Sequence, residues 1–112
     1  MPRFEFRGKS YNNPVELALD VVGGKWKMPI LWRLYERKWR YGELKRSLGT
    51  VTHKILTQQL RELERDGLIA RQVYAVIPPK VEYSITKKGR SVMPIIRRLR
   101  DWGLAFKAEA KT

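Results

Sequence analysis

Cysteine is absent from the 112 residues of this chain. Its absence excludes disulfides, thiolate nucleophiles, cysteine zinc sites and thiol-based redox sensing. The chain also lacks an apolar run long enough to span a bilayer, and Met1 to Ser10 contain no stretch like the apolar core of a signal peptide. We therefore expect a cytoplasmic protein with no membrane partner.

Acidic residues are scarce, since 11 Asp and Glu against 24 Lys and Arg leave a net charge of +13. Apolar residue types make up 43% of the chain, enough for one packed domain over residues 1–112. The excess charge is concentrated, because residues 25–65 hold eleven basic and four acidic side chains and residues 86–112 hold eight and two. Such clustering favours a surface that binds an anionic partner, of which nucleic acid is the commonest.

Four helices are predicted in the first part of the chain. Asn13 can cap the first, with Pro14 at its first position, and Gly23-Gly24 ends it. Thr52 can cap the fourth, whose leucines recur at helical spacing until Gly67 ends it. The apolar periodicity predicts helices over residues 14–22, 25–37, 41–48 and 53–66.

The apolar pattern changes its period after Gly67. Residues 69–75 and 81–85 alternate as strands do, and the connection 76–80 contains two prolines that prevent ladder pairing. Thr86 can cap a last helix, which Pro94 should kink unless its regular part begins later. The order predicts a mostly α (α+β) fold: a winged helix-turn-helix with a two- to three-stranded β-wing and flanking N- and C-terminal helices.

The fourth helix carries a face suited to DNA. Leu56, Leu60 and Leu63 fall on one side of the helical wheel, and a set that contains no acid falls opposite: Lys54, Thr57, Gln58, Arg61 and Arg65. Gln, Thr and Arg suit base edges, whereas Lys suits phosphates. Any amphipathic helix has a polar side, so the prediction also depends on the position of this helix between a short helix and a hairpin.

Recognition helices meet the major groove with their N-terminal residues, which assigns roles to the candidates. The predicted base contacts are His53, Lys54, Thr57 and Gln58, with Thr52 at the start of the same helix. Arg61 is expected to reach a base or a phosphate, and Arg65 a phosphate. The DNA backbone would be contacted by Arg40 and Lys45 near the third helix. Lys80, at the wing tip, would reach phosphates or the adjacent minor groove.

These segments resemble the HxlR family, bacterial and archaeal winged-helix regulators related to the MarR group. The matching strings run in family order over roughly residues 13–103. They are Asn-Pro-Val-Glu at 13–16, Gly-Gly-Lys-Trp-Lys at 23–27, LTQQLRELE at 56–64, Asp-Gly-Leu-Ile at 66–69, and PPKVEYSIT at 78–86 followed by Gly89-Arg90.

The resemblance implies a nucleoid-associated homodimer that regulates transcription from a pseudo-palindromic operator in double-stranded DNA, and we predict a repressor. It also implies a dimer interface built from the first and last helices, for which we select Leu17, Leu99, Trp102 and Phe106. Core packing is the alternative for each of them. Many family members carry a redox-sensing Cys where this chain has Asn13, so that function is not carried over. A small-molecule effector is left unidentified.

Two other function classes have to be compared with a transcription regulator. An enzyme is not expected, because the single histidine, His53, has no predicted carboxylate to orient it, and no catalytic residue, metal site or cofactor motif is visible. The alternative is a non-specific architectural or chromatin-type DNA-binding protein, which would explain the charge without the Gln and Thr of the fourth helix. A regulator should prefer its operator over random duplex by on the order of 10³-fold or more, which separates the two classes.

Overall fold

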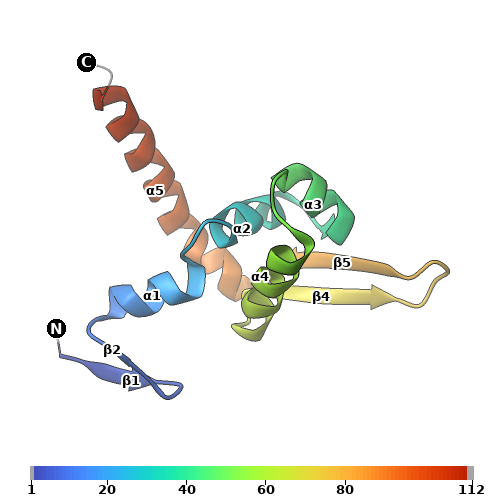
Figure 1. Ribbon diagram of the computed structural model, residues 1–112, viewed down its shortest axis with the longest axis horizontal. Coiled ribbons are helices and arrows are strands. Elements are labelled where there is room, and N and C mark those ends of the chain that lie inside the picture. The colour runs from blue at the N-terminus through green and yellow to red at the C-terminus, as the bar shows by residue number, and fades with distance from the viewer. Residues whose placement is uncertain (1, 111–112) are drawn as a thin grey trace.

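The computed structural model describes residues 2–110, which are mainly helical (Figure 1). The helices in this range are α1 (Pro14–Val22), α2 (Lys27–Glu36), α3 (Tyr41–Leu48), α4 (His53–Arg65) and α5 (Lys87–Ala110). The strands are β1 (Phe4–Phe6), β2 (Lys9–Tyr11), β3 (Trp39–Arg40), β4 (Ile69–Tyr74) and β5 (Lys80–Ile85). This arrangement confirms the predicted mostly α winged helix-turn-helix.

One hydrophobic cluster joins all the helices with the larger sheet. It takes Ile30, Leu31 and Leu34 from α2 and the three leucines of the predicted apolar face from α4, all of them at most 2% exposed. Each such side chain stabilises the fold by roughly 1.5–3 kcal/mol when it is fully buried. The cluster therefore holds α4 by one side only and leaves its other side in solvent.

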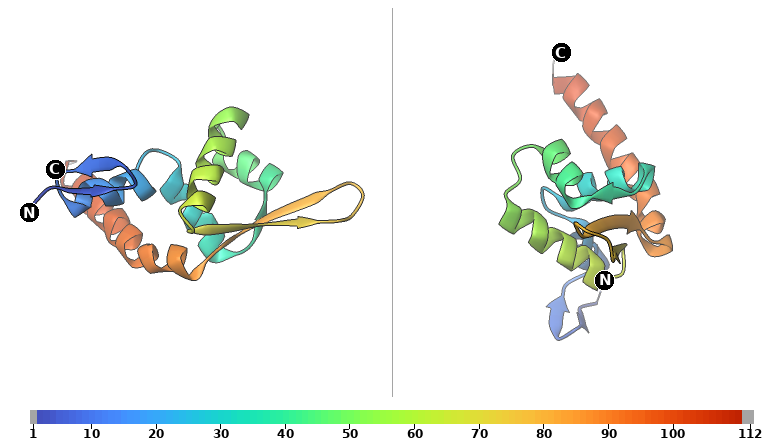
Figure 2. Two further views of the ribbon diagram at one scale, coloured as in Figure 1. Left: turned by 90° about the horizontal axis from the view of Figure 1, so that it is seen from below. Right: turned by 90° about the vertical axis from the view of Figure 1, so that its right-hand side faces the viewer.

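The wing is a three-stranded antiparallel sheet in the order β3-β5-β4. β4 and β5 pair from Ile69 opposite Ile85 to Tyr74 opposite Lys80, and the two residues of β3 pair with the other edge of β5. The third strand agrees with the predicted two- to three-stranded wing. Beyond Tyr74 the connection 75–79, here called the wing tip, extends past the helices (Figure 2).

Several element boundaries differ by one or two residues from the sequence prediction. α2 begins at Lys27 and ends at Glu36, which is shorter than the predicted 25–37. The first hairpin strand ends at Tyr74, and Lys80 belongs to the ladder of β5 and not to the connection. α5 begins at Lys87 as the predicted Thr86 cap requires, since the Thr86 side chain accepts a hydrogen bond from the Gly89 amide, and the helix continues past Pro94 to Ala110.

The N-terminal segment forms a β-hairpin, where the sequence analysis predicted no helix or strand. β1 pairs with β2 through a tight turn at Arg7-Gly8, where both residues have positive φ (53° and 75°). Phe4 stacks on Tyr11, and the buried Tyr11 donates a hydrogen bond from its hydroxyl to Asp20 of α1. The signal was the alternation from Phe4 to Tyr11 around an Arg-Gly turn.

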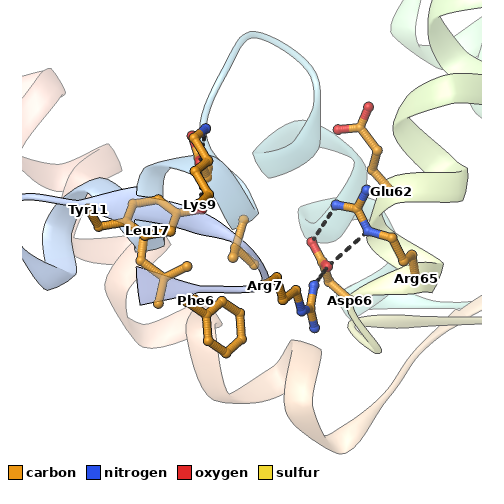
Figure 3. A pocket seen from close by; sticks show the side chains of 10 residues that line it. Phe6, Arg7, Lys9, Tyr11, Leu17, Glu62, Arg65 and Asp66 are labelled. Atoms are coloured by element: carbon orange, nitrogen blue, oxygen red, sulfur yellow. Dashed lines mark hydrogen bonds and ion pairs between the residues drawn. The ribbon is translucent and has the colours of Figure 1, made fainter. Parts of the chain in front are cut away.

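The N-terminal hairpin is joined to the end of α4 by one buried carboxylate (Figure 3). Asp66, whose side chain is 4% exposed, accepts hydrogen bonds from Arg7 at 2.5 Å and from Arg65 at 3.2 Å. Burial raises the pKa of Asp66, but the bonds from Arg65 and Arg7 more than offset that effect, so the pKa lies below its ordinary value of 3.8. The cluster links residues far apart in the sequence.

The second half of α5 projects away from the body of the protein, and every residue from 97 to 110 is exposed (Figure 1). Leu99, Trp102 and Phe106 are 48%, 66% and 60% exposed, so the core-packing alternative is wrong for all three. Leu17 is half-buried instead. No helix between residues 2 and 110 is both long and apolar enough to cross a membrane.

We expect Asp66→Asn to lower the free energy of unfolding at pH 7 by about 1–3 kcal/mol, because both charge-assisted bonds from the arginines weaken. A depressed pKa makes the carboxylate stabilising above pH 3.8, and this contribution is lost as the pH falls further. Urea titrations between pH 7 and pH 3 should therefore show that the free energy of unfolding falls less on acidification in the variant than in the wild type. The control is Asp101→Asn, since Asp101 pairs only with its exposed neighbour Arg100. Equal acid loss in wild type and Asp66→Asn would contradict the role of this carboxylate.

Candidate nucleic-acid interface

α4 is a well-capped helix with one polar side. Thr52 has extended backbone angles, and its side-chain oxygen accepts a hydrogen bond from the Ile55 amide, as predicted for an N-cap. The helix ends at Asp66, and Gly67 follows with φ of 78°. Since Leu56 and its partners are buried, the period of the helix directs the opposite positions to solvent.

Five of the predicted contact residues come together on that side. His53, Lys54, Gln58 and Arg61 are exposed and Thr57 is half-buried, and all five line one shallow hollow on the surface of α4. We call these five residues the reading face. The set offers imidazole, amide and hydroxyl groups for base edges and two cations for phosphates or guanine.

Glu62 borders the reading face, but its negative charge is compensated by a lysine of α2. Its carboxylate lies 2.8 Å from the ammonium group of Lys27, whose side chain is 5% exposed. The hydrogen bond from Lys27 is the main reason that the pKa of Glu62 lies below its ordinary value. The pair joins α2 to α4 across 35 positions, so no local spacing in the sequence indicates it. The pair keeps an uncompensated negative charge away from the expected phosphates.

Tyr41 at the start of α3 orients two residues of the reading face. Its hydroxyl lies 2.5 Å from Nδ1 of His53 and 3.4 Å from Oγ1 of Thr57, and the two rings meet edge to face. If the hydroxyl donates to Nδ1, the ring proton is on Nε2, which is then a donor for a base or phosphate. Sequence analysis used Tyr41 only as a helix boundary, and no local pattern indicated this contact.

Two predicted backbone contacts lie beside α4. Arg40 is exposed in β3, and its amide donates to Glu43 in the first turn of α3. Lys45 is half-buried on α3. The last turn of α3 is held by Arg33 of α2, which donates to the side chain and the carbonyl of Ser47. Their contacts with DNA stay predictions.

The remaining two predicted cations lie apart from the reading face. Arg65 is held by Asp66 at the far end of α4 and faces the N-terminal hairpin (Figure 3). Lys80 is the first residue of β5, so it lies in the strand ladder next to the wing tip and not on the tip itself. Its ammonium group lies 3.6 Å from Glu82 and over the ring of Tyr74. The wing tip itself is uncharged, and its Ile77 is fully exposed.

The second basic segment of the sequence forms a different surface. Arg90 and Arg97 of α5 lie over the ring of Tyr35, and Arg100 lies over Trp32, both aromatic residues being on α2. These three arginines therefore do not add to the reading face. Among residues 2–110 no group of three or more His, Asp and Glu could hold a metal ion.

Comparisons with known proteins agree with this geometry. A sequence model of the family described as HxlR-like helix-turn-helix matches residues 21–111. The HTH-type transcriptional regulator YdeP of Bacillus subtilis is 50% identical over 94 residues, which are 84% of this chain and 73% of YdeP. The crystal structure of the HTH-type regulator YtcD of Bacillus subtilis is 50% identical with a TM-score of 0.82, over 86% of this chain and 98% of that one. The redox regulator HypR in its reduced form is 43% identical with a TM-score of 0.83, over 88% and 98% of the two chains.

We expect Tyr41→Phe to weaken binding to the preferred DNA sequence by about 0.5–1.5 kcal/mol, because His53 and Thr57 lose the hydroxyl that orients them. The salt dependence of binding should not change, since no charge is removed. Fluorescence anisotropy at two salt concentrations measures both quantities. Tyr35→Phe is the matched control, because that hydroxyl bonds Arg97 on the other surface. An unchanged affinity for the preferred sequence would show that Tyr41 does not orient the reading face.

Proposed function

The chain belongs to the HxlR-like helix-turn-helix family, and on this premise we propose that it is a homodimeric repressor that binds a pseudo-palindromic operator in double-stranded DNA. As a family member it is a DNA-binding transcription regulator, like its relatives. The finer proposal concerns repression, the dimer and the operator. We also propose that residues 1–112 form one functional domain, because one hydrophobic cluster takes residues from all five helices.

The observation that carries the proposal is the reading face. It presents an amide, a hydroxyl, an imidazole and two cations on one side of a helix whose other side is fixed in the core. Its one acidic neighbour is paired with Lys27. A surface that only attracted phosphates would not need Gln58, whose amide can bond both groups of an adenine edge. We assign base contacts to His53, Lys54, Thr57 and Gln58.

The proposed dimer rests on the exposed stripe of α5. Ile95, Leu99, Trp102 and Phe106 follow one another at intervals of four, three and four residues and are all 48–66% exposed. This spacing places them on one side of the helix, as in helices that pair with one another. α1 adds the exposed Val15 and Leu19, whereas the predicted Leu17 is half-buried. A second copy of the chain is the partner that such a stripe fits.

A second candidate function has one observation in its favour. The arginines on Tyr35 and Trp32 form a basic surface outside the reading face, which suits a protein that coats DNA without a preferred sequence. Selection of bound duplexes from a random library separates the two functions. We expect an inverted repeat with half-sites about one helical turn apart, or a small multiple of that distance. Failure to enrich a sequence, with steep salt dependence on all duplexes, would support the architectural function instead.

Gln58→Ala should weaken binding to the operator identified by this selection by roughly 1–3 kcal/mol and leave binding to random duplex nearly unchanged. The reason is that the lost contacts are made to a base edge. Anisotropy titrations on both duplexes measure the difference. Gln59→Ala is the matched control, because the neighbouring Gln59 lies outside the reading face. Equal weakening on both duplexes would make Gln58 a backbone contact and contradict base readout.

Trp102→Ala should convert the dimer to monomers in light scattering without lowering the stability of the monomer, because Trp102 is 66% exposed in the single chain. The control is Leu104→Ala. Leu104 is equally apolar and 59% exposed, but two residues along the helix place it on the other side of α5. An intact dimer in the Trp102 variant, or an equal effect of both variants, would remove this stripe from the interface.

A further inference from the structure

A pocket of about 500 Å³ lies between the N-terminal hairpin, α1 and the end of α4 (Figure 3). The hairpin contributes Phe6, Arg7, Lys9 and Tyr11, α1 contributes Leu17, Asp20 and Val21, and the end of α4 contributes Glu62, Arg65 and Asp66. None of these residues belongs to the reading face. The pocket thus adjoins the recognition helix at the end farthest from the expected base contacts.

Three cations and three carboxylates line the pocket, but one of the carboxylates, Glu62, is already paired with a lysine outside the lining. Lys9 pairs with Asp20 at 2.6 Å, and Glu62 pairs with Lys27 at 2.8 Å. What remains is one carboxylate, Asp66, between the guanidinium groups of Arg7 and Arg65. Two cations therefore share one anion, which leaves one positive charge uncompensated.

The arginines also keep donors free. Asp66 is 4% exposed, but the side chains of Arg7 and Arg65 are 51% and 64% exposed. Arg7 bonds Asp66 through one terminal nitrogen, and Arg65 uses Nε and one terminal nitrogen. Each guanidinium carries five N–H donors in a planar fork that matches a carboxylate. One more carboxylate can thus be bound without taking either arginine from Asp66.

The other walls are apolar. Phe6, Leu17 and Val21 line the pocket, and the same three residues with Arg7 line an adjoining hollow of about 180 Å³ that extends to Lys88. The donors and the apolar walls therefore lie side by side. Such a combination selects molecules with one anionic end and one hydrophobic body.

We propose that this pocket binds a small organic monocarboxylate with an apolar body. Its carboxylate lies between Arg7 and Arg65 and brings the cluster to two cations and two anions, while the body packs on Phe6, Leu17 and Val21. A neutral molecule would leave the positive charge of the arginine pair uncompensated. The positions of these side chains support the binding site independently of any effect on DNA.

The consequence for DNA rests on the proposed function. The carboxylate would contact the last residue of α4 and the hairpin that Asp66 holds to it. If the occupant changes the affinity for the operator, the operator must change the affinity for the occupant by the same factor. Measuring ligand binding first on the protein without DNA separates a failure of the pocket from a failure of the proposed function.

The experiment titrates the DNA-free full chain with hexanoate and phenylacetate, and with 1-hexanol and 2-phenylethanol as neutral counterparts, by isothermal calorimetry and by amide chemical-shift mapping. We expect one saturable site per chain for the two acids, with shifts at Phe6, Arg7 and Arg65 and none at Trp102. Arg65→Gln should weaken the binding of both acids at least tenfold, and Phe6→Ala should weaken it too. Arg98→Gln, which removes an exposed arginine of α5, is the matched control and should leave it unchanged.

Three results would overturn the proposal: no saturable binding of either acid, equal binding of the acids and the alcohols, or shifts confined to residues outside the pocket. An unchanged affinity in Arg65→Gln would exclude the guanidinium pair as the carboxylate site. If the acids bind as expected but operator affinity does not respond, the pocket stands and only its link to DNA fails.

Discussion

The burial of one leucine face of α4 is the contact on which the rest of the structure depends. Leu56, Leu60 and Leu63 are inserted in the cluster formed by the other helices and the wing. Because the helix is rigid and has a fixed period, this burial determines which of its side chains face the solvent. The reading face is thus a consequence of core packing, and its precision depends on how firmly the leucines are held.

Three of the 11 acidic residues join different elements of the fold. Glu62 holds Lys27 of α2, Asp66 holds Arg7 of the N-terminal hairpin, and Asp20 holds Lys9. A carboxylate that is paired with a cation in this way adds no uncompensated negative charge to the basic surfaces. The chain therefore combines a high positive charge with a connected fold, and the same pairs place the pocket of Arg7 and Arg65 directly behind the recognition helix.

α5 separates two further surfaces by its own geometry. Its buried residues Met93 and Ile96 fix the helix on the core, the arginines lie on α2, and the stripe that contains Trp102 extends into solvent beyond the body (Figure 1). A dimer formed through that stripe would leave the arginines on Tyr35 and Trp32 uncovered by the same contact. The reading face, the exposed apolar stripe and the second basic surface thus lie on different parts of a small protein.

The sequence by itself determined the five helices, the wing and the side of α4 that faces solvent, because each depends on periodicity or on a cap within a few residues, such as Thr52 or Asn13. The family strings added the function. Only the tertiary structure decided that Asp66 joins Arg7 to Arg65, that Lys27 compensates Glu62, that Tyr41 orients His53 and that residues 4–11 form a hairpin fixed to the end of α4. These contacts join residues that are distant in the sequence or lie across a bend in the chain, and no local spacing predicts which charges or hydroxyls the packing of helices brings within hydrogen-bond distance.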